Sequence, residues 1–287
     1  MIQTPFNYTG SKFKLLEQIL PEFDYTKPYF VDVFAGGGSV YTNILDKYEK
    51  VIANDIISDL IGIHNSLLES DDIIEETKSL CFNLKENQEE FLKLRKDYND
   101  NPTPARLWAL MLSCNSNLIR FNKKGKFNQT WGKRSWNSST ESKTNDFINH
   151  TRQYKDKIHF SSRKFNEIPI PPTLGKSNKF MFYCDPPYGY VRSEDGSMGD
   201  KQISEAGYNN LYYKEDDLNL YNYCHKINDM GSSFMISGVI QHGGERSWIL
   251  EKLISDGFRY KELNFDYKKI NKSGVDKKTK EIIIMNY

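Results

Sequence analysis

The sequence contains few cysteines and no long apolar run. Its four cysteines, among 287 residues, are far apart and lack the paired spacing of metal ligands, so we expect reduced, buried thiols and no bound metal. No apolar stretch approaches the roughly 18 residues that a membrane span needs. The first residues have neither the basic start nor the apolar core of a signal peptide. We therefore expect a cytoplasmic protein without a membrane partner.

A strong overall charge is also missing, since 39 basic residues face 38 acidic ones and the formal net charge is +1. The charge is unevenly distributed, however. Residues 115–164 contain twelve Lys and Arg against three Asp and Glu, whereas residues 71–100 are acidic and have helical spacing. A concentrated basic segment in a neutral protein is typical of a site for a polyanion such as nucleic acid. A solvated basic surface without a partner is the alternative.

Apolar runs alternate with helical spacing at both ends of the chain, which predicts an α/β fold with a doubly wound sheet and the basic middle inserted into it. The run Phe180–Cys184 is apolar throughout and predicts a central buried strand. We expect a mobile loop at Ser135–Asn145, which is rich in Ser, Thr and Asn. The other expected strands are 30–34, 50–54, 157–160, 233–237, 258–265 and 281–287, and the expected helices are 40–45, 56–98, 105–112, 218–230 and 248–255.

The segment Val31–Ser39 predicts a cofactor site. Its glycines follow a strand, where open sheets bind cofactors and where a bare backbone can approach a ligand closely. A tight turn in an unrelated fold also uses glycines. Asp55 ends the next predicted strand, 23 residues beyond Asp32, where a carboxylate accepts hydrogen bonds from ribose hydroxyls. The pair indicates a nucleoside cofactor without saying which one.

The segment Asp185–Tyr188, Asp-Pro-Pro-Tyr, is more specific. The exocyclic nitrogen of adenine is a poor nucleophile because its lone pair is delocalised into the ring. Asp185 and the carbonyl of Pro186 would each accept one amino hydrogen, which favours a pyramidal nitrogen, and Pro187 helps to fix that carbonyl. Tyr188 offers a face on which a flipped base stacks. The alternative is an acidic turn stiffened by prolines.

Over nearly its whole length the chain resembles the Dam-like family of DNA adenine methyltransferases. Asn7–Lys12 resembles the family's N-terminal cofactor segment, and Asp32–Val40 its cofactor loop. Arg120–Asn128 is similar to its target-recognition hairpin, and Tyr183–Tyr188 to its catalytic motif. Ala53-Asn54-Asp55 and Glu281–Tyr287 match further family strands. The order and joint occurrence of these motifs make the resemblance specific.

The resemblance implies a Rossmann-like methyltransferase sheet, formed by residues 1–58 and 150–287, with an inserted and mainly helical target-recognition domain, residues 59–149, that carries a β-hairpin. It implies transfer of a methyl group from S-adenosyl-L-methionine to the exocyclic amine (N-6) of a flipped adenine in double-stranded DNA. The implied catalytic residues are Asp185, Pro186, Pro187 and Tyr188. The implied cofactor residues are Tyr8, Lys12, Asp32, Phe34, Gly36, Gly38, Asp55, Phe165 and Asp185. The implied DNA-binding residues are Arg120, Asn122, Lys123, Lys124, Lys126, Asn128 and Arg134.

Several alternatives stay open. Asn7 and Asn115 stand where GATC-specific members have base-reading residues, whereas Arg120 aligns with an arginine that reads guanine, so GATC is one candidate site among others. Other candidates are methylation of RNA or of a protein amide, and an inactive DNA-binding module. A partner restriction endonuclease of the same site and the oligomeric state are open as well. The five histidines form no triad and are expected to be structural or on the surface. The lysines between Lys268 and Lys280 contact phosphates or form a solvated hairpin.

Overall fold

The structure, a computed structural model, describes residues 1–6, 8–168, 177–187, 189–203, 212–264 and 279–287. Asn7, Tyr188 and five of the C-terminal lysines, from Lys268 to Lys278, lie outside the described residues. The chain divides into two compact units. Unit 1 comprises Met1–Phe13 and Ala35–Lys164, and unit 2 comprises Lys14–Phe34 and Phe165–Tyr287.

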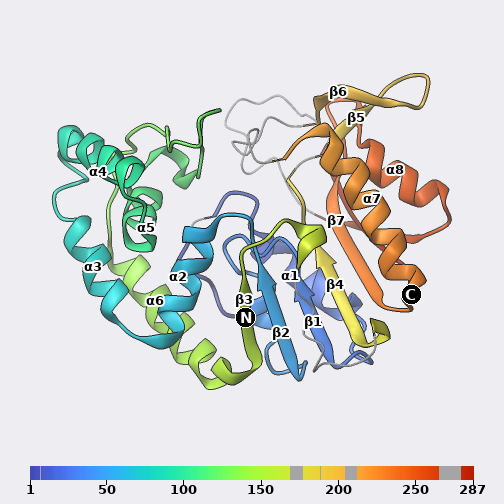
Figure 1. Cartoon of the computed structure of the whole chain (residues 1–287), viewed down its shortest axis with the longest axis horizontal. Helices are drawn as coiled ribbons and strands as arrows, with labels where there is room; N and C mark the ends of the chain where they lie inside the picture. Colours follow the sequence, from blue (N-terminus) through green and yellow to red (C-terminus); the bar gives the residue numbers. More distant parts are fainter. Residues whose placement is uncertain (7, 169–176, 188, 204–211, 265–278) are drawn as a thin grey trace. The chain divides into compact units, whose positions relative to one another are not determined.

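Unit 2 is built on a mixed sheet in which five strands follow one another in the order β1, β4, β7, β10 and β9. Strands β1, β4 and β7 are parallel, and β10 and β9 are antiparallel to their neighbours. Helices α7 and α8 contact each other and β7 (Figure 1). The strands are β1 (Tyr29–Asp32), β4 (Phe180–Cys184), β7 (Ser233–His242), β9 (Arg259–Leu263) and β10 (Thr279–Met285), with the short β5 (Tyr190–Arg192), β6 (Met198–Gln202) and β8 (Glu245–Arg246); the helices are α1 (Leu16–Ile19), α7 (Lys214–Asp229) and α8 (Trp248–Ser255).

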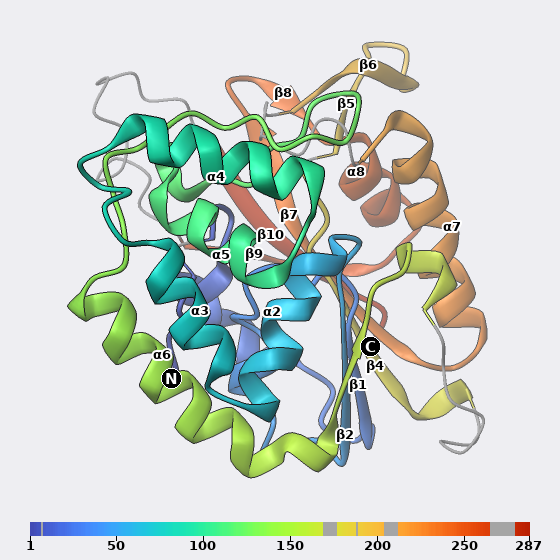
Figure 2. The ribbon, with the colours of Figure 1, turned by 60° about the vertical axis from the view of Figure 1, so that its left-hand side comes forward.

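Unit 1 combines one parallel strand pair with a group of helices (Figure 2). Helix α5 is the centre of this group, because eight of its ten residues are buried and it packs against α2, α3 and α4. Such all-round burial is expected of an apolar helix inside a bundle. The strands are β2 (Lys50–Asn54) and β3 (Ile158–Ser161), and the helices are α2 (Ser58–Glu69), α3 (Asp72–Leu80), α4 (Gln88–Asp100), α5 (Pro104–Ser113) and α6 (Ser138–Thr151).

The prediction of a mobile loop at Ser135–Asn145 is wrong. Asn137 caps α6 by accepting a hydrogen bond from the amide of Thr140, and the helix continues to Thr151. Ser, Thr and Asn are favoured at the N-cap of a helix. The polar composition that suggested a loop therefore belongs in part to the start of α6. Burial of Phe147 and of the threonines on one face stabilises the helix.

The helix predicted at 40–45 is also too long, since only the 3₁₀ turn η3 (Tyr41–Asn43) forms there. The helix expected at 56–98 is instead three helices, α2, α3 and α4, and Asn83, between α3 and α4, has a positive φ of 63°. The other predicted strands and helices are present with shifted ends. Phe180–Cys184 is buried along its whole length, and all four cysteines are free and buried. A mixed α/β fold with parallel central strands is thus confirmed. The inserted recognition domain at 59–149 stays a prediction. Within the described residues, no helix is long and apolar enough to cross a membrane.

Candidate active site

The first part of the candidate site lies where β1 ends in unit 2. Asp32 is almost completely buried and lies opposite Tyr183 of β4 in the parallel register. The amide of Val33 continues this pairing by donating to the Tyr183 carbonyl at 2.9 Å. The rings of Phe34 and Phe165 lie 5.5 Å apart. Unit 2 therefore holds three of the predicted cofactor residues, Asp32, Phe34 and Phe165, together with Asp185.

The glycine loop that continues from Phe34 belongs to unit 1, where Asp55 holds it. Gly36 has a positive φ of 48°, and its amide donates to Asp55 Oδ2 at 3.0 Å. The amide of Ile57 donates to the other oxygen, Oδ1, also at 3.0 Å. Burial raises the pKa of Asp55, and these amides oppose that rise. Asp55 thus orients the loop, and each oxygen of its carboxylate can accept a further hydrogen bond.

Tyr8 lies directly against this loop. A Cβ atom on Gly36 would come within 2.8 Å of the Tyr8 ring, and one on Gly37 within 2.6 Å of the Tyr8 Cβ atom. Only glycine allows this close approach. Lys12, another predicted cofactor residue, is largely buried, and its Nζ donates to the Gly10 carbonyl at 3.2 Å. The predicted cofactor residues of unit 1 therefore form a cradle of bare backbone bordered by an aromatic ring and a carboxylate.

His64 of α2 completes the support of the loop. Its Nε2 lies 2.9 Å from the Gly36 carbonyl oxygen, and its Nδ1 lies 2.9 Å from the Tyr41 hydroxyl. A carbonyl oxygen only accepts, so Nε2 carries the hydrogen and Nδ1 accepts from Tyr41. Burial lowers the pKa of His64 to about 4, which keeps the ring neutral near pH 7. His64, expected to be structural or on the surface, is therefore buried and structural. It binds the carbonyl of Gly36, the residue whose amide Asp55 binds.

The predicted catalytic motif follows β4 in unit 2. The Ser237 hydroxyl of β7 donates to Asp185 Oδ1 at 2.9 Å, because an ionised carboxylate only accepts. The Ser237 oxygen then accepts from the Tyr183 hydroxyl at 2.8 Å. Tyr183 and Ser237 are fully buried, whereas Asp185 and the two prolines are half-buried. A buried relay of two hydroxyls thus orients the carboxylate. The sequence motif includes Tyr183, but sequence reasoning assigned no role to its hydroxyl and did not identify Ser237.

The predicted recognition hairpin forms in unit 1 and is firmly anchored. Phe121 pairs with Phe127 across a turn that contains Gly125 at a φ of 70°, and the Asn122 side chain accepts from two amides of that turn. Phe127 is buried, and its amide and carbonyl both bond to the side chain of Asn99 on α4. The hairpin therefore presents its exposed residues from a fixed backbone.

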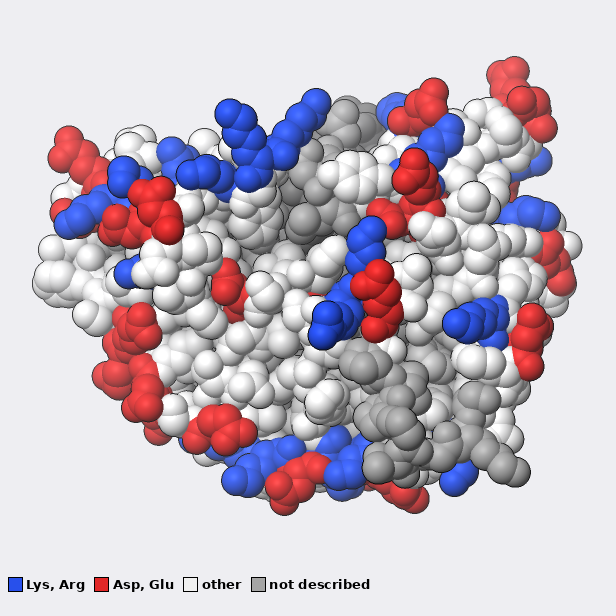
Figure 3. Space-filling model, in the orientation of Figure 1, with Lys and Arg blue, Asp and Glu red and all other residues white. Residues whose placement is uncertain are grey.

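The basic residues of this segment differ in their contacts. Arg120 donates from Nε and Nη2 to the side chain and carbonyl of Asn128, at 2.9 and 3.0 Å, which leaves the Nη1–Nη2 edge of the guanidinium pointing away from Asn128. Arg134 donates to Asn117 at 2.7 Å. Lys123, Lys124 and Lys126 are exposed. In Figure 3, basic side chains gather over this part of unit 1, while acidic and basic side chains lie side by side over α4.

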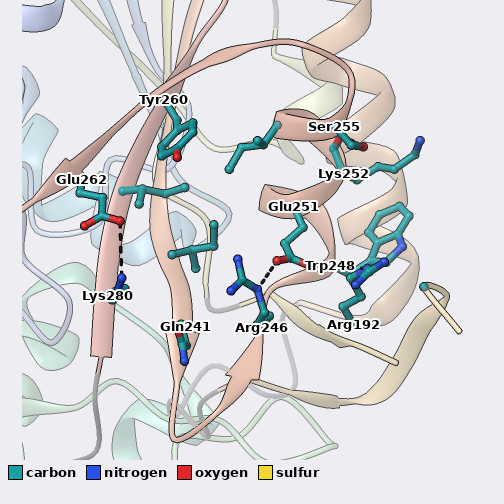
Figure 4. Close-up of a pocket in the computed structure, with 14 residues that line it drawn as sticks. Arg192, Gln241, Arg246, Trp248, Glu251, Lys252, Ser255, Tyr260, Glu262 and Lys280 are labelled. Carbon is teal, nitrogen blue, oxygen red and sulfur yellow. Dashed lines mark hydrogen bonds and ion pairs between the residues drawn. The ribbon is translucent and has the colours of Figure 1, made fainter. Parts of the chain in front are cut away.

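A separate cavity of about 630 Å³ lies in unit 2 between α8 and strands β7, β9 and β10 (Figure 4). Several of its charged residues pair with one another: Arg246 donates to Glu251, and the charged atoms of Lys280 and Glu262 lie 3.6 Å apart. None of the predicted site residues is among its lining residues in the described part of the chain. The predicted site residues lie elsewhere: Asp32 and Asp185 lie at the ends of β1 and β4 in unit 2, and Asp55 follows β2 in unit 1.

Comparison with known proteins agrees with this chemistry. Residues 8–268 match the model of the D12 class N6 adenine-specific DNA methyltransferase family. The chain belongs to this family. The family predicted from the motifs is thereby confirmed.

Three relatives illustrate the similarity. The chain is 30% identical over 293 residues to modification methylase StsI of Streptococcus sanguinis and 27% identical over 292 residues to type II methyltransferase M.FokI of Planomicrobium okeanokoites. In both cases the match covers 100% of this chain and 43% of the relative, so the chain spans less than half of their length. A DNA adenine methylase of Serratia marcescens is 29% identical over 189 residues, which cover 63% of this chain and 65% of the relative.

The neutral state of His64 predicts a specific dependence of stability on pH. Its folded pKa is about 4, against an ordinary value of 6.5, so the unfolded chain binds a proton first as the pH falls. The resulting stability is fully present above pH 6.5 and is lost as the pH falls through 4, by about 3 kcal/mol. Urea unfolding at several pH values should therefore show a steeper acid loss for the wild type than for His64→Gln. His159→Gln, at an exposed position, is the control and should follow the wild type. Parallel profiles for wild type and His64→Gln would contradict the buried neutral ring.

Proposed function

We propose that the chain is a site-specific DNA adenine methyltransferase that transfers a methyl group from S-adenosyl-L-methionine to the exocyclic amine of an adenine flipped out of double-stranded DNA. The observation that carries this proposal is the Asp185 carboxylate at the end of β4, held by Ser237, in a chain of the D12 class family. Names of the relatives support a role beside a restriction endonuclease of the same site.

The chemistry follows from the positions of two acceptors. Asp185 and the Pro186 carbonyl each accept one hydrogen of the adenine amine, so that its lone pair points away from the ring. The bond from Ser237 fixes the rotation of the carboxylate before the base arrives, which removes a reorganisation cost from the reaction. As the amine gains positive charge, the carboxylate stabilises it electrostatically. Tyr188 would stack on the flipped base.

The cradle described above fits a methyl-donating nucleoside. Glycine at positions 36 and 38 lets the loop pack tightly, because a Cβ atom there would clash with Tyr8 or with Tyr41 and His64. Asp55, which holds this loop, has lone pairs for ribose hydroxyls. Phe34 and Phe165 offer apolar ring faces to the adenine part. When bound, S-adenosyl-L-methionine supplies a methyl group on a sulfonium, which is activated for direct displacement. Lys12, Asp32 and Asp185 are the further residues that we assign to this site.

The anchored hairpin supports duplex DNA as the substrate. Exposed Lys123, Lys124 and Lys126 suit phosphate contacts, which position a protein without reading sequence. Arg120 suits a bidentate contact to guanine, because Asn128 orients its guanidinium. Asn122, Asn128 and Arg134 complete the proposed DNA-binding set. An RNA or a protein amide would have less use for such a hairpin, and we keep these substrates as outcomes of the test.

The direct test offers one labelled methyl donor in parallel to DNA, RNA and protein. We expect label in double-stranded DNA, as N6-methyladenine, and a loss of transfer in Asp185→Ala while cofactor affinity changes by only a few fold. The reason is that Asp185 acts mainly on the target base. Calorimetry with S-adenosyl-L-methionine checks the affinity. Label confined to RNA or protein, or an active Asp185→Ala variant, would refute the proposal.

The hairpin predicts two different binding defects. Lys124→Ala should weaken binding to all DNA about equally and reduce the salt slope by roughly one unit, because it removes one phosphate contact. Arg120→Ala should cost about 1–3 kcal/mol at the cognate site and relax discrimination at one base pair. Salt titrations of binding measure the first effect, and sequencing of methylated positions in host DNA measures the second. Lys50→Ala, at the amino end of β2, is the control. If both hairpin variants bind DNA like the wild type, the segment is only a solvated surface.

A further inference from the structure

The first turn of α7 contains three consecutive acidic residues, of which only Asp217 is completely buried. Burial raises the pKa of Asp217 to about 6, so its charge is unfavourable in this environment. A carboxylate is retained at such a position only where it satisfies donors that would otherwise be buried without partners. The hydrogen-bond donors of Asp217 therefore indicate its structural role.

Asp217 accepts hydrogen bonds from two donors, one just after the Asp-Pro-Pro-Tyr segment and one just before α7 in the sequence. The amide of Tyr190 donates to Oδ2 at 2.6 Å, and the hydroxyl of the buried Tyr212 donates to Oδ1 at 2.8 Å. In the sequence, Tyr190 stands two residues after the Asp-Pro-Pro-Tyr segment, and Tyr212 directly precedes Tyr213, the N-cap residue of α7. One carboxylate thus ties the exit of the motif to the start of the helix.

Gly189 shows how closely the carboxylate approaches the backbone. A Cβ atom on Gly189 would come within 2.8 Å of Asp217 Oδ2 and 3.1 Å of Oδ1. The Gly189 carbonyl in turn accepts from the amide of the buried Ile203 at 2.9 Å. The backbone directly after the Asp-Pro-Pro-Tyr segment is therefore fixed from two directions, four residues beyond Asp185.

We propose that Asp217 is a positioning residue for methyl transfer, which holds the backbone at Gly189–Tyr190 so that the preceding catalytic motif keeps its geometry. The proposal rests on the proposed function of that motif. Asp217 touches neither the base nor the methyl donor in this account. Its effect passes through the backbone to the Pro186 carbonyl and to Asp185. The distance between these two acceptors determines how the adenine amine is held.

The variants Asp217→Ala and Asp217→Asn separate positioning from charge. Ala removes both acceptors. Asn is neutral but keeps both hydrogen bonds, because its oxygen accepts from the Tyr190 amide and its amide group donates to the Tyr212 hydroxyl, which can rotate. Glu215→Ala removes an exposed carboxylate from the same turn and is the matched control. Each full-length variant is measured for single-turnover methyl transfer to DNA, for affinity to S-adenosyl-L-methionine and for its thermal midpoint.

We expect Asp217→Ala to lower the single-turnover rate by about 10–100-fold, as a small displacement of reacting groups does. The affinity of Asp217→Ala for the cofactor should stay within about 2-fold of the wild type. Asp217→Asn should restore the rate to within a few fold of the wild type, and Glu215→Ala should behave like the wild type. If Asp217→Ala does not fold, Gly189→Ala tests the same point, because its methyl group displaces the backbone from Asp217 and should give the same loss of rate.

A wild-type rate in Asp217→Ala, or in Gly189→Ala where that variant replaces it, would overturn the positioning role. So would a loss of rate that merely follows the loss of folded protein. Absence of methyl transfer by the wild type itself would instead refute the proposed function, so the two failures are distinguishable.

Discussion

The parallel pairing of β4 with β7 fixes the geometry on which the candidate active site depends. In this register Tyr183 lies opposite Met235 and Cys184 opposite Ile236, so the next residues along the strands are Asp185 and Ser237. Side chains alternate along a strand, which puts Tyr183 and Asp185 on one face together with Ser237. A slip of one residue would turn Ser237 to the other face and leave the carboxylate without this donor. Burial of the apolar residues on both strands therefore sets the orientation of the carboxylate that we propose as catalytic.

The same physical device recurs at other carboxylates of the chain. Asp55 accepts from the amides of Gly36 and Ile57, and Asp217 accepts from the Tyr190 amide and a hydroxyl. Each of these donors is neutral, so it orients the carboxylate and leaves the charge in place. An ion pair would orient the group as well but would cancel the charge. At Asp185 the retained negative charge suits the proposed reaction, in which a positively charged methyl donor meets a nitrogen that becomes positive. At Asp217, which touches neither group, the hydrogen bonds position the backbone and the charge is not required.

Much of the fold could be predicted from the sequence, because apolar runs such as Phe180–Cys184 must be buried whatever their neighbours are. The positions of the glycine loop after β1 and of Asp185 after β4 could also be predicted, since both follow apolar runs that read as strands. Their roles in binding and catalysis stay proposals. Helix α6 was not, because Ser, Thr and Asn are common both in loops and at helix starts.

The supporting residues of the site were missed for a related reason. Ser237 stands inside an apolar strand, and its partner is 52 residues away, so only the strand register joins them. His64 lies on the buried face of α2, where histidine is usually structural. Helical periodicity alone does not show which of the three acidic residues in the first turn of α7 accepts the Tyr190 amide. These roles depend on pairings over long sequence distances.

The central claim, that a buried hydroxyl relay orients the catalytic carboxylate, is tested most directly by single-turnover methyl transfer with Ser237→Ala. Ser233→Ala deletes a hydroxyl from the same strand, one that donates to Asp24, and serves as the control. We expect Ser237→Ala to reduce formation of N6-methyladenine by about 10–100-fold, the worth of a hydrogen bond to a charged group, with cofactor affinity unchanged and Ser233→Ala near the wild-type rate. Equal rates for Ser237→Ala and the wild type would contradict the claim.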